Sequence, residues 1–174
     1  METKTIAYPQ TKSIFFEYTL IALAFLIPLF ISGPQFLTGT VVNSLIFLFA
    51  LQQPNLKRTL PFIIAPSIGT IGNGILFGTV THFLFYFLPF IWMANYVLIV
   101  SFKSLLKKNS LIVSVVGSGI LKFLTLFFVA YLFTIGKIVP SIFIQFMGLF
   151  QLYTALAGGI LALGIHTIIK NTYD

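Results

Sequence analysis

Residues 110–133 read SLIVSVVGSGILKFLTLFFVAYLF, a continuous apolar run in which Lys122 is the one charged side chain. A helix that crosses the hydrocarbon core of a bilayer needs about 20 apolar residues in succession. Strands of an outer-membrane β-barrel instead show alternating segments of about 10 residues, a pattern that is absent here. The run therefore predicts a transmembrane α-helix.

The composition of the whole chain agrees with a membrane protein. Of its 174 residues, 58% are hydrophobic and 7% are charged, whereas a soluble domain has about 25% charged residues. This excludes a soluble enzyme, a nucleic-acid-binding module and a disordered tail. The net charge of +7 is interpreted as a topology signal, because basic residues mark cytoplasmic loops; nucleic acid is not an expected partner.

We expect an all-α polytopic membrane protein, a single domain over residues 1–174 with six transmembrane helices. The break at Gly33-Pro34 ends the first helix, since proline cannot continue the helical hydrogen-bond ladder. Pro89 suits the first turn of the fourth helix. Segments 79–88 and 140–148 are too short to cross, and whether they are re-entrant or interfacial is left open. The six predicted helices span residues 13–32, 36–52, 60–78, 89–106, 110–133 and 149–169.

The basic residues predict the orientation of this bundle. If both termini lie on the cytoplasmic side, the outer loops receive only Lys137, as the positive-inside rule requires. We therefore predict a multi-pass protein of the cytoplasmic membrane, with N-in and C-in topology. The basic residues that this places inside are Lys4, Lys12, Lys57, Arg58, Lys103, Lys107, Lys108 and Lys170.

Lys122 is the most informative single residue. It lies about 18 Å from the inner end of its helix, and a lysine inside a membrane helix costs about 2.5–3.5 kcal/mol on insertion scales. Ser114 and Ser118 precede it at intervals of four, so one helix face is polar. The alternative is that Lys122 faces lipid and extends its long side chain to the surface.

Several amides and hydroxyls are predicted at the same depth, in the outer half of the membrane. By the helical rise, Asn43, Asn95 and Asn73 lie about 8–10 Å from the outer ends of their helices. A shared depth favours a pocket, although single polar residues in membrane helices commonly link helices together. Lys122 would pair with a carboxylate or phosphate, and Trp92 or Tyr96 would stack on a ring. The predicted solute-binding residues are Lys122, Asn95, Asn43, Asn73, Gln151, Thr38, Trp92 and Tyr96.

Small residues on the last helix predict a close helix contact. Ala155 with Gly159, and Gly158 with Ala162, are pairs of small residues four positions apart, which let helix backbones approach closely. We expect these four residues to contact a partner subunit, with packing inside the chain as the alternative.

Catalysis is not expected. The chain has only three acidic residues and no cysteine, so neither a metal cluster nor a Ser/His/Asp set can be assembled, and no metal or cofactor is expected. A proton-coupled transporter normally has a carboxylate within the membrane, and Glu17 lies near the inner end of its helix. If the protein moves a solute, another subunit supplies the energy.

Four motifs carry a resemblance to a known group: Thr38-Gly39-x-x-x-Asn43, Pro89-Phe90-Ile91-x-x-x-Asn95, Leu121-Lys122-Phe123 and Gln151-Leu152-x-Thr154-Ala155-x-x-Gly158-Gly159. They resemble uncharacterised prokaryotic proteins similar to the S components of energy-coupling factor (ECF) transporters. That group is often labelled iron hydrogenase, which a chain without cysteine does not support. The resemblance implies capture of a vitamin, nucleobase-like compound or metal from outside. It also implies partners: a transmembrane coupling subunit and two ATPase subunits.

We therefore expect a membrane subunit that binds a small, anionic organic solute or vitamin for uptake. The alternative is a structural or assembly subunit of a larger membrane complex, with no ligand of its own.

Overall fold

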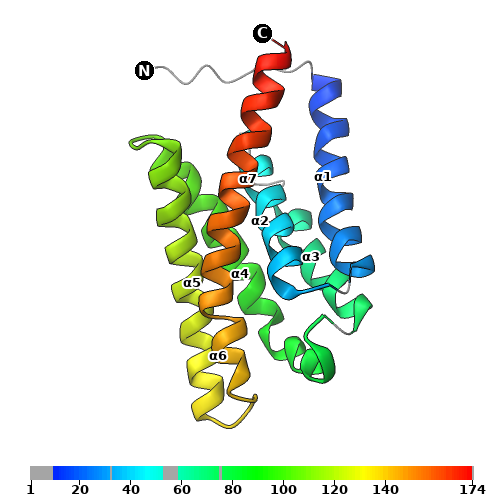
Figure 1. Cartoon of the computed structure of the whole chain (residues 1–174), viewed down its shortest axis with the longest axis vertical. Helices are drawn as coiled ribbons and strands as arrows, with labels where there is room; N and C mark the ends of the chain where they lie inside the picture. The colour runs from blue at the N-terminus through cyan, green and yellow to red at the C-terminus, as the bar shows by residue number, and fades with distance from the viewer. Residues whose placement is uncertain (1–9, 32, 53–58, 75, 174) are drawn as a thin grey trace.

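The chain forms a bundle of long helices, and the beginning of the first helix and the end of the last helix lie at the same end of the bundle (Figure 1). The computed structural model describes the backbone of residues 10–31, 33–52, 59–74 and 76–173, and side chains within 15–169 of that part. This part contains no strand, so the predicted all-α class is confirmed. Its elements are α1 (Gln10–Phe30), α2 (Gln35–Gln52), α3 (Leu60–Asn73), the 3₁₀ helix η2 (Gly78–Phe83), α4 (Leu84–Leu106), α5 (Leu111–Ile135), α6 (Ile142–Phe146) and α7 (Leu149–Tyr173).

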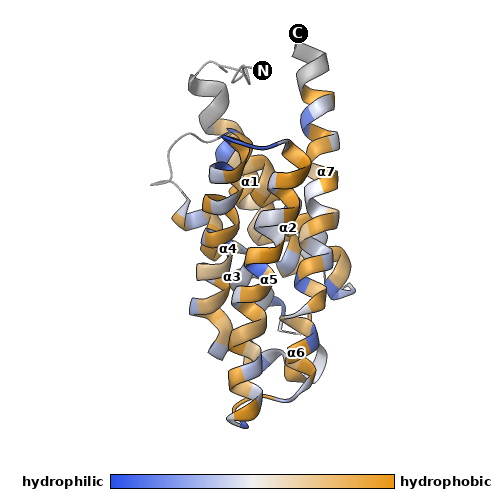
Figure 2. Cartoon of the chain, turned by 90° about the vertical axis from the view of Figure 1, so that its left-hand side faces the viewer, coloured by the Kyte–Doolittle hydropathy of each residue, from blue (hydrophilic) through white to orange (hydrophobic). Residues whose placement is uncertain are grey.

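The helices have the composition of a membrane protein, with apolar residues along most of their length (Figure 2). Phe15, Phe30 and Ile160 are 77%, 76% and 72% exposed, which suits lipid better than water. Among the described residues, four segments are long and apolar enough to cross a membrane: Gln35–Gln52, Gly78–Leu106, Leu111–Ile135 and Ile142–Ile169. The apolar stretches Phe15–Phe30 and Leu60–Asn73 are shorter. Six spans therefore remain a prediction.

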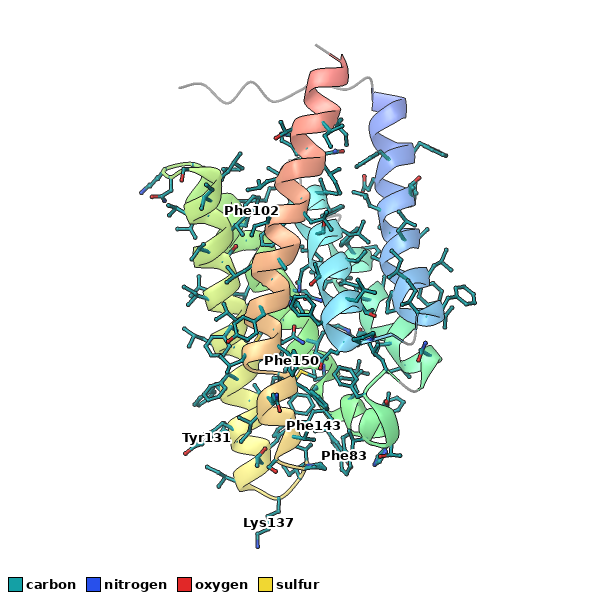
Figure 3. All side chains as sticks on the ribbon, viewed as in Figure 1. Phe83, Phe102, Tyr131, Lys137, Phe143 and Phe150 are labelled. Atoms are coloured by element: carbon teal, nitrogen blue, oxygen red, sulfur yellow. The ribbon has the colours of Figure 1, made fainter. Side chains whose placement is uncertain are left out.

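The orientation in the membrane also remains a prediction. Lys107 and Lys108 are exposed at the turn between α4 and α5, and Lys137 extends from the opposite end of the bundle (Figure 3). Lys4, Lys57 and Arg58 lie outside the described residues, as do the side chains of Lys12 and Lys170.

Two predicted boundaries are wrong, both around the segment 74–88. The third helix ends at Asn73 rather than at residue 78, because Gly74 adopts the left-handed conformation (φ 74°) and its amide caps the carbonyl of Thr70. The fourth helix begins at Leu84 rather than at Pro89, since Leu84 continues directly from η2 with helical angles. Pro89 therefore lies inside α4.

The other predicted helices lie close to where they were expected. At the start of α5, the side chain of Ser110 accepts a hydrogen bond from the amide of Val113, which is the usual cap of a helix N-terminus. The short segment 140–148 contains the one-turn helix α6, and its Phe143 is fully buried.

The small residues of α7 pack inside the chain. A Cβ atom added at Gly158 would lie 2.6 Å from the carbonyl oxygen of Thr40 on α2, and one at Gly159 would lie 2.2 Å from Val115 on α5. Ala155 and Ala162 are also completely buried. The structure therefore buries these four residues inside the chain, which agrees with the alternative of intramolecular packing. Their contact with a partner subunit stays a prediction.

The core is divided into two apolar clusters. One gathers around Phe47 and Phe102, whose rings are 5.0 Å apart, and the other around Phe87 and Phe143, at 5.1 Å. Asn95 lies on α4 between Phe87, which belongs to the second cluster, and Leu98, which belongs to the first. The polar site described below therefore occurs where the two clusters meet.

The contact between α2 and α7 predicts the result of a matched pair of substitutions. Gly158→Ala should lower the melting temperature of the detergent-purified protein, because the new methyl group meets backbone atoms of α2 that cannot move aside. Gly164→Ala on the same helix meets nothing within 4 Å and should be neutral or slightly stabilising, since alanine favours helix. Equal melting temperatures for the two variants would contradict the close packing.

Candidate functional site

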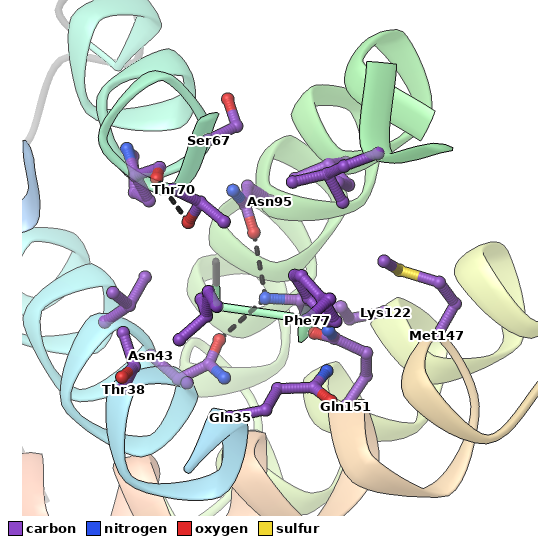
Figure 4. A pocket seen from close by; sticks show the side chains of 16 residues that line it. Gln35, Thr38, Asn43, Ser67, Thr70, Phe77, Asn95, Lys122, Met147 and Gln151 are labelled. Atoms are coloured by element: carbon purple, nitrogen blue, oxygen red, sulfur yellow. Dashed lines mark hydrogen bonds between the residues drawn. The ribbon is translucent and has the colours of Figure 1, made fainter. Parts of the chain in front are cut away.

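The centre of the site is the ammonium group of Lys122, which lies inside the bundle (Figure 4). Its Nζ donates hydrogen bonds to Oδ1 of Asn43 at 2.7 Å and to Oδ1 of Asn95 at 2.8 Å. Lys122 is 3% exposed, and each asparagine is 2% exposed. Three residues far apart in the sequence, on α5, α2 and α4, therefore meet at one depth, and Lys122 does not extend into lipid.

A second set of hydrogen bonds connects this centre to two more helices. Nδ2 of Asn43 donates to Oγ1 of Thr154 on α7 at 3.1 Å. Nδ2 of Asn95 donates to the carbonyl oxygen of Ile63 on α3 at 3.3 Å. We call Lys122, Asn43, Asn95 and Thr154 the lysine network. It links α2, α3, α4, α5 and α7.

Local sequence explains why Lys122 faces inward. The hydroxyls of Ser114 and Ser118 donate to carbonyls of their own helix, one turn back, so they need no partner elsewhere. Both serines are fully buried. A Cβ added at Gly119 would lie 3.4 Å from Ala155 of α7. The small residues before Lys122 thus make one face of α5 narrow enough to pack against α7.

The lysine network borders a cavity of about 80 Å³. Pockets for drug-sized ligands usually measure about 300–1,000 Å³, so this cavity suits a molecule of only a few heavy atoms. Its wall comes from the starts of α2 and α7, the middle of α3, α4 and α5, and the loop before η2. The lining residues are Gln35, Thr38, Gly39, Val42, Asn43, Pro66, Ser67, Thr70, Leu76, Phe77, Leu84, Ile91, Asn95, Lys122, Met147 and Gln151.

Five of the eight predicted solute-binding residues line this cavity, namely Lys122, Asn43, Asn95, Thr38 and Gln151. The structure brings them together from four helices. The sequence predicted their depth in the membrane from the helical rise, but not which of them contact one another.

The other three predicted residues lie elsewhere. Nδ2 of Asn73 donates to the carbonyl of Leu29 at 2.9 Å, which ties α3 to the end of α1. Nε1 of Trp92 donates to Oγ of Ser67 at 2.7 Å, and the indole packs beside the core. Tyr96 is 45% exposed on the outside of the bundle. None of the three lines the cavity.

Gln35 is a lining residue that the sequence analysis missed. Its Nε2 donates to the carbonyl of Phe146 at 3.0 Å, which connects the start of α2 to α6. The signal was present in the spacing, because Gln35, Thr38 and Val42 recur at intervals of three and four and so share one helix face. Its position directly after the break at Pro34 left it just outside the predicted helix 36–52.

Some hydrogen-bond donors and acceptors around the cavity are not used within the described residues. The ammonium of Lys122 has three N–H donors, and the described residues supply acceptors for two. Oγ1 of Thr38 and Oε1 of Gln35 are buried without a hydrogen-bond partner among the described residues. An unpaired buried polar group is costly, so these atoms indicate where a ligand or water would bind.

Lys122 is the one basic side chain in the described wall of the cavity. No acidic side chain lines the cavity, and Glu17 of α1 is the one acidic residue whose side chain the structure describes. No group of three possible metal-binding side chains of His, Cys, Asp or Glu occurs among the described residues. The described site can therefore attract a small anion and offer it hydrogen bonds.

No protein-family model, curated protein or solved structure matches this chain. The fold and site define an all-helical bundle of membrane-protein composition with a buried lysine at a small cavity. The resemblance to ECF S components remains a prediction from motifs.

A double-mutant cycle tests the energy of the lysine network. Asn95→Leu should destabilise the protein, because it leaves the Lys122 ammonium with one acceptor fewer in a buried place. Once Lys122→Met has removed the charge, Asn95→Leu should cost less. We expect a coupling free energy of about 1.5–3 kcal/mol, measured by denaturant unfolding in micelles.

The control for this cycle is Asn109→Leu, at an exposed turn residue far from Lys122 along the bundle. Its effect should add to that of Lys122→Met without coupling. Additive effects for Asn95→Leu as well would show that the observed hydrogen bond does not contribute to stability.

Proposed function

We propose that this protein is a membrane subunit that captures a small anionic organic solute in the cavity beside Lys122. The observation that supports this proposal is the buried ammonium group of Lys122. It donates hydrogen bonds to two neutral acceptors, Asn43 and Asn95, and one N–H remains for a ligand. No acidic side chain lies in the described cavity wall. Charged residues inside membrane bundles usually mark substrate or ion pathways.

The hydrogen-bonding groups without a partner determine how a ligand would bind. One oxygen of a carboxylate would accept the third N–H of Lys122, and the hydroxyl of Thr38 would donate to the same anionic group. The asparagines would stay on the lysine and hold its ammonium in place, which reduces the entropy lost on binding. A cavity of about 80 Å³ favours a short-chain acid over a vitamin.

We further propose that uptake is energised by partners, as the ECF resemblance implies: a transmembrane coupling subunit with two ATPase subunits. Two features support this. The chain has only three acidic residues, and the described cavity has no carboxylate with which to couple uptake to protons. The orientation proposed is N-in and C-in in the cytoplasmic membrane, with the cavity in the outer half.

The rival function is a structural subunit of a membrane complex. The observation in its favour is the lysine network itself, because hydrogen bonds that link five helices would also serve as interhelical ties. The two functions differ in the hydroxyl of Thr38, which lines the cavity and has no hydrogen-bond partner among the described residues, so it links no helices together.

Thr38→Val provides the test, since it keeps the shape and removes only that hydroxyl. Folding stability should be unchanged or higher, while carboxylate affinity should fall about ten- to hundredfold, the loss of one hydrogen bond to a charged group. Affinity is measured by the shift in melting temperature of the purified protein with formate, acetate, glycolate and glycine, because a ligand that binds the folded state stabilises it.

Thr40→Val is the matched control. Oγ1 of Thr40 is also buried and unpartnered on α2, but Thr40 does not line the cavity, so affinity should not change. Lys122→Met should abolish the ligand-induced shift. If none of these acids stabilises the wild-type protein and it co-purifies with a fixed set of membrane proteins, the structural role is correct.

A further inference from the structure

Gln35 requires the ligand to have a hydrogen-bond donor, whereas Lys122 requires an acceptor. Its Oε1 is buried without a partner, and its side chain lies on the same side of the Lys122 ammonium as that of Gln151 (Figure 4). An amide oxygen only accepts hydrogen bonds. An anionic group cannot satisfy it, because a carboxylate is also an acceptor.

The orientation of the Gln35 amide is determined by its other end. Nε2 donates to the carbonyl oxygen of Phe146 at 3.0 Å. Rotating the amide by half a turn would bring Oε1 against that carbonyl, two acceptors in contact, and would lose the bond. Oε1 is therefore the atom that stays available.

The amide of Gln151 has the same orientation as that of Gln35. Its Nε2 points to the same carbonyl of Phe146, at 3.4 Å, and Gln151 also lines the cavity. Both amides thus direct their NH₂ groups toward α6. Around the cavity, donor capacity comes from Lys122 and Thr38. The amide oxygens of Gln35 and Gln151 both lack a hydrogen-bond partner among the described residues, and that of Gln35 is the buried one.

We infer that the ligand is a carboxylate of two or three carbons that also carries a hydroxyl or ammonium donor, with the carboxylate at Lys122 and the donor at Oε1 of Gln35. This inference rests on the proposed function and narrows its substrate class. The size limit comes from the cavity of about 80 Å³. The donor requirement comes from the buried acceptor, which a ligand without a donor would leave unpaired at a cost.

A ligand series tests the inference on the unmodified protein. Acetate has the carboxylate without a donor, glycolate adds a hydroxyl, and glycine adds an ammonium group. At least one of glycolate and glycine should bind about five- to tenfold more tightly than acetate, the effect of one added hydrogen bond, as measured by isothermal titration calorimetry of the detergent-purified protein. Gluconate, a six-carbon hydroxy acid, should not bind.

The variants Gln35→Leu and Gln145→Leu locate the effect. Gln35→Leu should reduce the preference over acetate to about one while acetate still binds. Gln145 is exposed on α6 and outside the cavity lining, so Gln145→Leu should keep the preference. If Gln35→Leu fails to fold, the ligand series with the wild-type protein still tests the donor requirement.

The outcomes separate this inference from the function on which it rests. If all three small acids bind equally, the donor requirement is wrong and anion capture stands. If gluconate binds as tightly as glycolate, the size limit is wrong. If no acid binds at all, the proposed function fails, and the inference fails with it.

Discussion

The rest of the structure depends on the burial of one positive charge. Removing an ammonium group from water is costly unless hydrogen bonds replace its hydration, and Lys122 obtains two from Asn43 and Asn95. Those asparagines sit on α2 and α4, and their amide groups in turn bind α7 and α3. The register of five helices is thus coupled to the position of a single nitrogen atom.

Close packing makes this arrangement possible. Gly158 and Gly159 allow α7 to lie directly against α2 and α5, which brings Thr154 within hydrogen-bond distance of Asn43. Apolar clusters on both sides of the polar centre shield it from lipid. Low polarity around the centre strengthens each of its hydrogen bonds, and it also raises the cost of the acceptors and donors left unused.

The same network would serve both stability and the proposed ligand capture, so the loss of Lys122 alone cannot separate the two. Substitutions of Thr38 and Gln35 can, because Oγ1 of Thr38 and Oε1 of Gln35 have no partner in the part of the chain that the structure describes. The size of the cavity bears on the resemblance to S components. A vitamin would require the surrounding helices to move apart, whereas a short hydroxy or amino acid suits the cavity as it stands.

Composition and hydropathy alone determined the helical membrane class, and the helical rise alone placed Lys122, Asn43 and Asn95 at a common depth. The boundaries near Gly74 and Leu84 could not be predicted, because a left-handed cap and a 3₁₀ turn depend on how the neighbouring helices pack. Only the tertiary structure decided which polar residues meet. Depth is set along each helix axis, but rotation about that axis is set by packing against neighbours, and it directed Gln35 into the cavity while leaving Tyr96 outside.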